Sequence, residues 1–179
     1  MKSALIAGGG NKNEGFDYYP TPPEATHALM CFLKLPICEI WEPACGNGAM
    51  SDVMKEYGHK IISSDLRHTG YGEGGIDFLS GNRECDAVIT NPPFGLAAEF
   101  IAHGLRNAET VAMLLKAHYW HAAKRKKLFE EHPPAWVLPL TWRPNFLEGR
   151  GKSPTMDFQW TVWRAGDKDT KYRLLGRDV

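Results

Sequence analysis

The sequence has few cysteines and lacks a paired cysteine motif. Its four cysteines are Cys31, Cys38, Cys45 and Cys85, and none forms a CxxC pair. Zinc sites built from thiolates usually place two cysteines within a few residues of each other. The spacing therefore argues against a zinc site and is poor evidence for a disulfide framework. We expect core or bystander thiols in a reducing compartment.

Long apolar runs and an excess of charge of one sign are also missing. No apolar stretch is long enough to span a bilayer, and the first apolar run is too short for a signal peptide. Lys and Arg together number 21, as do Asp and Glu, so the formal net charge is zero. This balance argues against a general positive coating for nucleic acid, although it allows a local basic patch. We expect a cytoplasmic protein with no membrane partner.

The length of 179 residues fits one domain with a sizeable core. We expect a flexible arm over residues 1–16, a folded domain over residues 17–165 and a carboxyl-terminal tail over residues 166–179. No internal repeat or clear linker interrupts the folded part.

Strand-like and helix-like stretches alternate along the chain. Strands are expected to begin near positions 37, 59, 85, 110, 135 and 158, and helices are expected over 21–34, 49–58, 96–108 and 121–132. Thr21 is expected to cap the first helix, with prolines in its first turn. A glycine-rich loop is expected over residues 70–75. The alternation is typical of an α/β fold with a mostly parallel sheet and helices on both faces.

A glycine-rich turn, EPACGNG, follows the first expected strand and precedes a helix. Gly46 and Gly48 permit a tight turn and a close approach of the backbone to a ligand, and the following helix offers free N–H groups. The third glycine of the dinucleotide fingerprint is missing, and Glu42 would repel a pyrophosphate. A cationic ligand fits better, although a plain strand-to-helix turn also explains the motif.

Two acidic residues follow at the ends of later stretches. Asp65 closes the second strand, where a carboxylate can accept hydrogen bonds from two ribose hydroxyls. Asp77 can accept from an exocyclic amine, and the ring of Phe78 can cover a purine. Each also has a plainer explanation: a cap or turn for Asp65, and a turn aspartate beside a core phenylalanine for the other two.

These stretches, together with Asn91-Pro92-Pro93-Phe94, are similar in order and spacing to the S-adenosylmethionine-dependent amino methyltransferases, especially those acting on adenine N6 in DNA. The stretch YYPTPPEA (18–25) resembles an element that several of these enzymes place against the cofactor. RPNF (143–146) and WTVW (160–163) resemble small phage-type enzymes. The resemblance implies a Rossmann-like methyltransferase sheet, mostly parallel with an antiparallel late strand, and S-adenosylmethionine (SAM) as cofactor.

The resemblance also implies a set of site residues. Cofactor-binding residues would be Tyr19, Thr21, Pro22, Glu42, Ala44, Gly46, Gly48, Asp65, Leu66, Asp77, Phe78 and Asn91. Catalytic residues would be Asn91, Pro92 and Phe94, and no metal is expected.

The NPPF corner has a chemical rationale in such an enzyme. An exocyclic amine is a poor nucleophile because its lone pair is delocalised into the ring. The Asn91 side-chain carbonyl and the Pro92 backbone carbonyl can accept both amine hydrogens and favour a more tetrahedral nitrogen. The prolines restrict the backbone, which preorganises both acceptors. Phe94 can stack on a base that is flipped out or single-stranded.

The loop over residues 143–157 is expected to emerge near the active face. Its Arg143, Arg150 and Lys152 are candidates for substrate binding through nucleic acid, and an ordinary long hairpin is the alternative. The basic run KRKK (124–127) is more typical of a solvated helix face. HYWH (118–121) is more typical of an aromatic cluster at a strand end than of a metal site.

DNA is the expected partner, and several alternatives stay open. Only sixteen residues follow Trp163, so we expect no separate recognition domain, and relaxed specificity, a homo-oligomer or a specificity partner could compensate. The motif also occurs in enzymes that methylate RNA adenine or guanine amines, cytosine N4 and protein glutamine. Cytosine N4 enzymes more often have Ser in place of Asn91. A catalytically silent partner subunit is the non-enzyme alternative.

Overall fold

The computed structural model describes residues 19–146 and 153–177. The arm predicted over residues 1–16 lies outside this range, as do Arg150 and Lys152.

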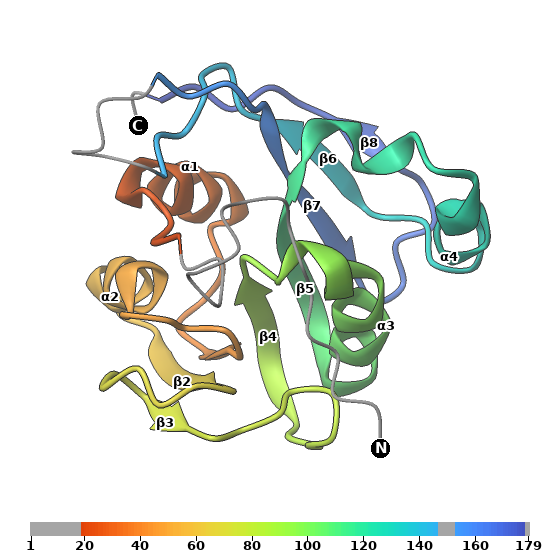
Figure 1. Cartoon of the computed structure of the whole chain (residues 1–179). Coiled ribbons are helices and arrows are strands. Elements are labelled where there is room, and N and C mark those ends of the chain that lie inside the picture. Colours follow the sequence, from red (N-terminus) through yellow and green to blue (C-terminus); the bar gives the residue numbers. More distant parts are fainter. Residues whose placement is uncertain (1–18, 147–152, 178–179) are drawn as a thin grey trace, which may run out of the picture.

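One eight-stranded sheet runs through the molecule in the order β3-β2-β1-β4-β5-β7-β6-β8 (Figure 1). The strands are β1 (Glu39–Glu42), β2 (Lys60–Asp65), β3 (Glu73–Gly74), β4 (Cys85–Thr90), β5 (Ala108–Lys116), β6 (Trp136–Pro139), β7 (Phe158–Arg164) and β8 (Lys171–Tyr172). Strands β1 to β5 pair in parallel, whereas β7 runs antiparallel to both β5 and β6. The predicted mostly parallel sheet with an antiparallel late strand is confirmed.

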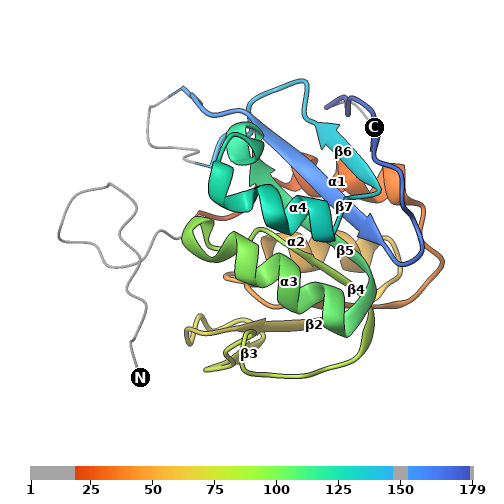
Figure 2. The same cartoon turned by 90° about the vertical axis from the view of Figure 1, so that its right-hand side faces the viewer.

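Helices cover both faces of the sheet, as predicted. The α-helices are α1 (Pro23–Leu33), α2 (Ala49–Glu56), α3 (Ala97–Asn107) and α4 (Lys126–Glu131). Helices α1 and α2 lie on one face, and α3 and α4 lie on the other (Figures 1 and 2).

The core consists of two layers that share the central strands. Along β5, Ala112 and Leu114 pack with α1 and α2, while Val111, Met113 and Leu115 pack with α3. This alternation follows from the two-residue period of a strand, and it buries β5 on both faces. Trp160 of β7 is fully buried, and its indole N–H donates to the carbonyl of Ala25 over 2.8 Å, which fastens α1 to the sheet.

The sheet topology determines where polar side chains can meet. From β1 the chain crosses to β2 on one side, and from β4 it crosses to β5 on the other. The strand order therefore reverses between β1 and β4, and the carboxyl ends of all four strands meet at one edge. Open α/β sheets bind ligands at such a switch point.

Three predictions of local structure were wrong. Thr21 does not cap α1: the N-cap residue is Pro22, and the Thr21 hydroxyl instead accepts a hydrogen bond from Asn91. The loop predicted over 70–75 contains β3, which extends the sheet beside β2. The helix predicted over 121–132 is shorter: a 3₁₀ turn (Ala123–Arg125) leads into α4, and the Arg125 guanidinium donates to the Tyr119 carbonyl ahead of the turn.

The predicted tail, residues 166–179, is part of the sheet within its described residues. Strand β8 pairs with β6, and the N–H of Leu175 donates to the Pro139 carbonyl over 2.9 Å. Leu175 is 6% exposed and belongs to the core under α1. So short an apolar pattern gives no strand signal in the sequence, and its pairing partner β6 is distant along the chain.

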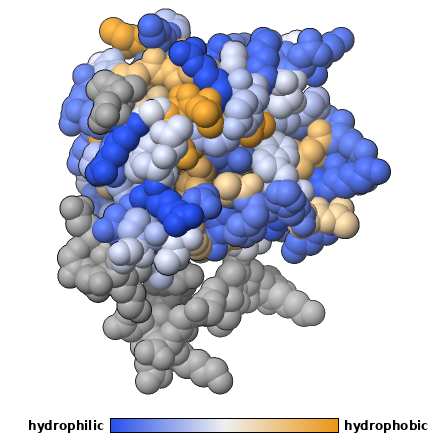
Figure 3. Space-filling view, turned by 90° about the horizontal axis from the view of Figure 1, so that it is seen from above, coloured by the Kyte–Doolittle hydropathy of each residue, from blue (hydrophilic) through white to orange (hydrophobic). Residues whose placement is uncertain are grey.

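On the face seen from above, the described residues show small hydrophobic patches among hydrophilic ones (Figure 3). Within the described ranges, every helix falls short of the length and apolar character needed to cross a membrane.

The adjacent leucines at the carboxyl end test whether β8 belongs to the fold. Leu175→Ala should lower the free energy of unfolding by about 2–4 kcal/mol, because it leaves a cavity in the core. Leu174→Ala is the matched control, since Leu174 is 55% exposed, and it should change stability by about 0.5 kcal/mol or less. Denaturant unfolding of both variants measures this difference, and equal effects would contradict the packing of Leu175.

Candidate active site

A cleft of about 500 Å³ opens at the carboxyl edge, across the switch point. Its walls come from the turn after β1, the end of β2, residues 76–79, the NPPF corner after β4, and the end of β5. A volume of this size is typical of pockets that enclose a small organic ligand.

The glycine turn at one end of the cleft needs its glycines. Gly48 has φ of +86°, and a Cβ there would lie 2.2 Å from the Tyr71 ring. The Tyr71 hydroxyl donates to Asp52 over 2.5 Å and so holds the β2–β3 connection against α2, which follows the turn. Gly46 has φ of +54°, and its N–H donates to Asp65 over 2.9 Å. The turn is therefore fixed to the end of β2.

Asp65 is buried and ionised at the end of β2. Its carboxylate accepts from the Gly46 N–H, from the Arg67 N–H over 2.9 Å and from Arg67 Nε over 3.0 Å. Burial acts to raise its pKa, but the bonds from Arg67 and Gly46 outweigh burial and hold the pKa below its usual value. The next side chain, Leu66, is 64% exposed and lines the cleft.

Glu42 is the most deeply buried carboxyl group of the cleft. Only 2% of it is exposed, and it accepts a short hydrogen bond from the Ser51 hydroxyl. Burial raises the pKa of Glu42 to about 8; the Ser51 bonds oppose this shift, while Asp65 and Asp52 add to it. Glu42 is therefore largely protonated at neutral pH in the protein alone, although it lines a cleft suited to a cation.

Asp77 and Phe78 fit both interpretations of the sequence, a place at the ligand site and a turn aspartate beside a core phenylalanine. Both line the cleft. Asp77 accepts from the Leu79 N–H over 3.0 Å and from the Ser80 hydroxyl over 2.8 Å, as a turn aspartate does. Phe78 is 2% exposed, and its ring centroid lies 4.9 Å from that of Trp41. Most of the Phe78 surface is therefore committed to the core.

Asn91 projects from the end of β4 with its amide oriented by a second residue. Its Nδ2 donates to the Thr21 hydroxyl over 3.1 Å. Its Oδ1 is buried and has no hydrogen-bond partner in the described part of the chain. A buried carbonyl oxygen without a partner is costly, so its retention in a cleft points to a ligand donor.

Phe94 begins a 3₁₀ turn (Phe94–Leu96) after the two prolines. Its ring is half-buried and lies 4.0 Å from Lys116 Nζ, measured to the ring centroid. The ring of Phe158 lies near it, with 6.2 Å between the ring centroids. Phe94 and Lys116 both line the cleft, and the ammonium group lies over the ring.

Most of the predicted site residues meet in this cleft. Those that line it are Tyr19, Thr21, Glu42, Ala44, Gly46, Asp65, Leu66, Asp77, Phe78, Asn91, Pro92 and Phe94. Pro22 and Gly48 do not line it: Pro22 is the N-cap of α1, and Gly48 is packed under Tyr71.

Sequence reasoning missed two charged residues of the cleft, Arg67 and Lys116. Lys116 stands at the end of the apolar run of β5, as Asp65 and Asn91 stand at the ends of apolar runs. The sequence signal that identified those two residues was therefore also present for Lys116. Arg67 gave no such signal, because its role depends on a contact with Asp65 two residues away.

The residues expected on the target side are less clearly placed. Arg143 is exposed, pairs with Asp157 over 2.7 Å and does not line the cleft. In the basic run, Lys126 and Lys127 form exposed i,i+4 ion pairs with Glu130 and Glu131, as expected for a solvated helix face. Among the described residues no cluster of three metal-ligating side chains occurs.

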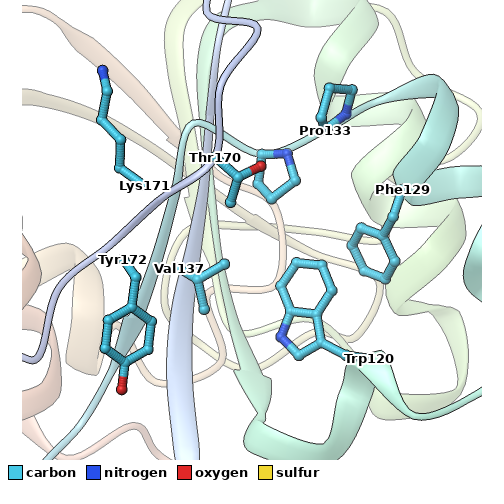
Figure 4. Close-up of a pocket in the computed structure, with 8 residues that line it drawn as sticks. Trp120, Phe129, Pro133, Val137, Thr170, Lys171 and Tyr172 are labelled. Carbon is cyan, nitrogen blue, oxygen red and sulfur yellow. The ribbon is translucent and has the colours of Figure 1, made fainter.

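A second hollow lies over β6 and β8 and has a different character. Figure 4 shows Trp120 and Phe129 on one side of it, and Lys171 and Tyr172 on the other. Its volume is about 440 Å³, and no carboxylate, imidazole or amide side chain lines it among the described residues. Of these two hollows, the cleft at the switch point is therefore the one that holds acid and amide side chains among the described residues.

Comparison with solved structures identifies the fold. A candidate RNA methyltransferase from Pyrococcus horikoshii has a TM-score of 0.69 at 17% identity, over 86% of this chain and 90% of that chain. Magnesium protoporphyrin IX methyltransferase from Synechocystis, with bound SAM, has a TM-score of 0.56 at 15% identity, over 79% of each chain. The fold is that of a methyltransferase.

The modification subunit of a candidate type I restriction enzyme from Vibrio vulnificus is also similar. The TM-score is 0.61 at 13% identity, over 88% of this chain and 47% of that chain. No family model and no curated protein sequence matches the chain.

Burial of Glu42 predicts a pH dependence of stability. The pKa of Glu42 is raised from 4.5 in the unfolded chain to about 8 in the folded protein. The contribution of Glu42 to the free energy of unfolding is therefore fully present below pH 4.5 and is lost as the pH rises through 8. The glutamine of the Glu42→Gln variant cannot ionise. As the pH rises from 5 to 8.5, the free energy of unfolding of this variant should therefore increase by roughly 2–4 kcal/mol relative to that of the wild type.

Denaturant unfolding across this pH range measures the effect. Glu39→Gln, at the more exposed start of the same strand, controls for loss of a carboxyl group and should follow the wild-type curve. Parallel pH curves for Glu42→Gln and the wild type would show that Glu42 is ionised in the folded protein throughout.

Proposed function

We propose that this protein is a SAM-dependent methyltransferase that acts on the exocyclic N6 amine of adenine in DNA. The observation that carries the proposal is the buried, unpartnered Oδ1 of Asn91 in a cleft that also holds Phe94. An acceptor oxygen beside an aromatic ring suits a planar base with an amino group.

The cleft residues fit the parts of SAM. The ionised Asp65 at the end of β2 can accept from ribose hydroxyls when these replace the Arg67 guanidinium, which bonds to both carboxylate oxygens. The exposed face of Leu66 can support an adenine ring. Glu42 offers a carboxyl group for a cationic amino acid moiety near the glycine turn. The bound SAM in the Synechocystis neighbour supports this assignment.

The chain's own groups account for activation of the amine. When bound, SAM would supply an electrophilic methyl group on a cationic sulfur; the sulfur would keep the electron pair of the broken S–CH3 bond, and the methylated amine would lose one proton to solvent. Asn91 Oδ1 and the Pro92 carbonyl accept the two amine hydrogens and direct the nitrogen lone pair into the cleft. Thr21 holds the Asn91 amide in the required orientation over 3.1 Å, and Pro92 and Pro93 limit the backbone. Phe94 stacks on the base.

The choice of DNA adenine rests on the resemblance of the motifs to small phage-type enzymes. Asn91, where cytosine N4 enzymes more often have Ser, favours adenine. The Vibrio vulnificus modification subunit is consistent with a DNA substrate, whereas the Pyrococcus horikoshii neighbour is named for RNA. RNA is therefore the second candidate, and the nucleoside product distinguishes the two.

Cofactor binding should be coupled to ionisation of Glu42. A cation beside this carboxyl group lowers its pKa, so SAM binding should release a proton between pH 6 and pH 8. Calorimetric titration in buffers of different ionisation enthalpy measures the release. Some protons come from the titration of SAM itself, and both proteins should release these. The additional proton that the wild type releases should be absent in Glu42→Gln. Equal proton release by both proteins would place the cation elsewhere.

Asn91 should separate chemistry from cofactor binding. Asn91→Ala should lower the single-turnover transfer rate by about 10²–10³, because it removes one preorganised acceptor. SAM affinity and the melting temperature should change little. Asn91→Asp keeps an acceptor oxygen that Thr21 can still orient, so it should retain more activity. A folded Asn91→Ala protein that transfers methyl at the wild-type rate would contradict the mechanism.

A further inference from the structure

Lys116 has a position in the cleft that the reaction outlined above does not explain. It is the last residue of β5 and pairs in register with Phe158 of β7. Its ammonium lies 4.0 Å from the centroid of Phe94. Within residues 19–146 and 153–177, no carboxylate lies within ion-pairing distance of Lys116.

The charges of the cleft are separated along the sheet. Glu42, Asp65 and Asp77 come from β1, β2 and the segment after β3, all on the far side of β4 from Lys116. Each of the three already accepts hydrogen bonds from nearby protein groups. Among the described residues, Lys116 therefore lies apart from these acids at the β5 end of the cleft, whereas Arg67, the other cation that lines the cleft, pairs with Asp65.

Because Phe94 and Lys116 both line the cleft, the ammonium occupies ring surface that a stacked target base would need. A cation over an aromatic face is a favourable contact, so Phe94 is capped while no base is present. When a base stacks on Phe94, the ammonium has to leave the ring. A lysine side chain is long and flexible and binds phosphate as a point charge. The anion nearest to an entering nucleotide is its own phosphodiester.

We propose that Lys116 is a target-binding residue that leaves the face of Phe94 when the target nucleotide enters and binds the phosphate beside that nucleotide. This inference rests on the proposed function, because it requires a nucleic acid substrate. It gives the site a preference for a base that is attached to a phosphodiester over a free base.

Binding of a short single-stranded oligodeoxynucleotide with one adenine tests the proposal. Lys116→Met keeps the apolar stem and removes the charge. The matched control is Lys168→Met, because Lys168 is exposed in the turn after β7, at the edge opposite Phe158. Fluorescence anisotropy at several salt concentrations, with S-adenosylhomocysteine present, gives the affinity and its salt dependence.

Lys116→Met should weaken binding by about 10-fold or more and lower the salt slope by about 0.7–1, as expected for loss of one phosphate contact. Lys116→Arg should keep the slope, and Lys168→Met should leave affinity and slope near the wild-type values.

A neutral methylphosphonate placed on either side of the adenine completes a double-mutant cycle. One of the two replacements should weaken wild-type binding by about 10-fold and have no further effect on Lys116→Met. Full additivity of the two changes, or an unchanged salt slope for Lys116→Met, would overturn the phosphate contact.

Failure of the inference about Lys116 can be distinguished from failure of the proposed function. The wild-type protein could bind the oligonucleotide with the predicted coupling and yet transfer no methyl group to it. This result would support the phosphate contact of Lys116 and contradict the proposed function. A wild-type protein that does not bind the oligonucleotide overturns the inference about Lys116.

Discussion

The burial of the central strands on both faces is the constraint on which the site depends. In β4, Val88, Ile89 and Thr90 are almost completely excluded from solvent, and β5 is covered by helices on both sides. A charged side chain cannot be accommodated along such strands without a partner, so chemistry is confined to their ends. Because the strands are parallel, these ends coincide. Glu42, Asp65, Asn91 and Lys116 thus reach one cleft from four consecutive positions in the sheet.

Within the cleft, the fold separates two tasks. The side of β1 and β2 carries the glycine turn and the acids, and Gly46 is held directly by Asp65. The side of β4 and β5 carries an unpaired acceptor, an aromatic ring and a cation. Thr21 connects the segment before α1 to the target side through the Asn91 amide. The position of the reacting groups therefore depends on how α1 packs, which the Trp160 indole fixes from β7.

Local patterns predicted much of this arrangement, and contacts distant in sequence explain the rest. Strand ends marked by Asp65 and Asn91 are visible in the sequence because an apolar run stops there. The contact of Thr21 with Asn91 could not be seen in the sequence. A threonine before a helix indicates a helix cap, and Asn91 lies 70 residues further along the chain. Strand β8 was missed because two residues show no period, and its stability comes from β6. Residues 147–152 lie outside the described chain, so the predicted contribution of Arg150 and Lys152 stays a prediction.

The most direct test is transfer of a labelled methyl group from SAM to DNA, RNA and protein in parallel, followed by digestion and nucleoside analysis. The arrangement of Asn91, Phe94 and Lys116 predicts label on the amino group of a nucleic acid base. The proposed resemblance to phage-type enzymes predicts this label in DNA as N6-methyldeoxyadenosine, with little in RNA or protein. Label in RNA alone, in another base or in protein would contradict the substrate. Binding of SAM without transfer to any of the three would contradict the enzymatic role itself.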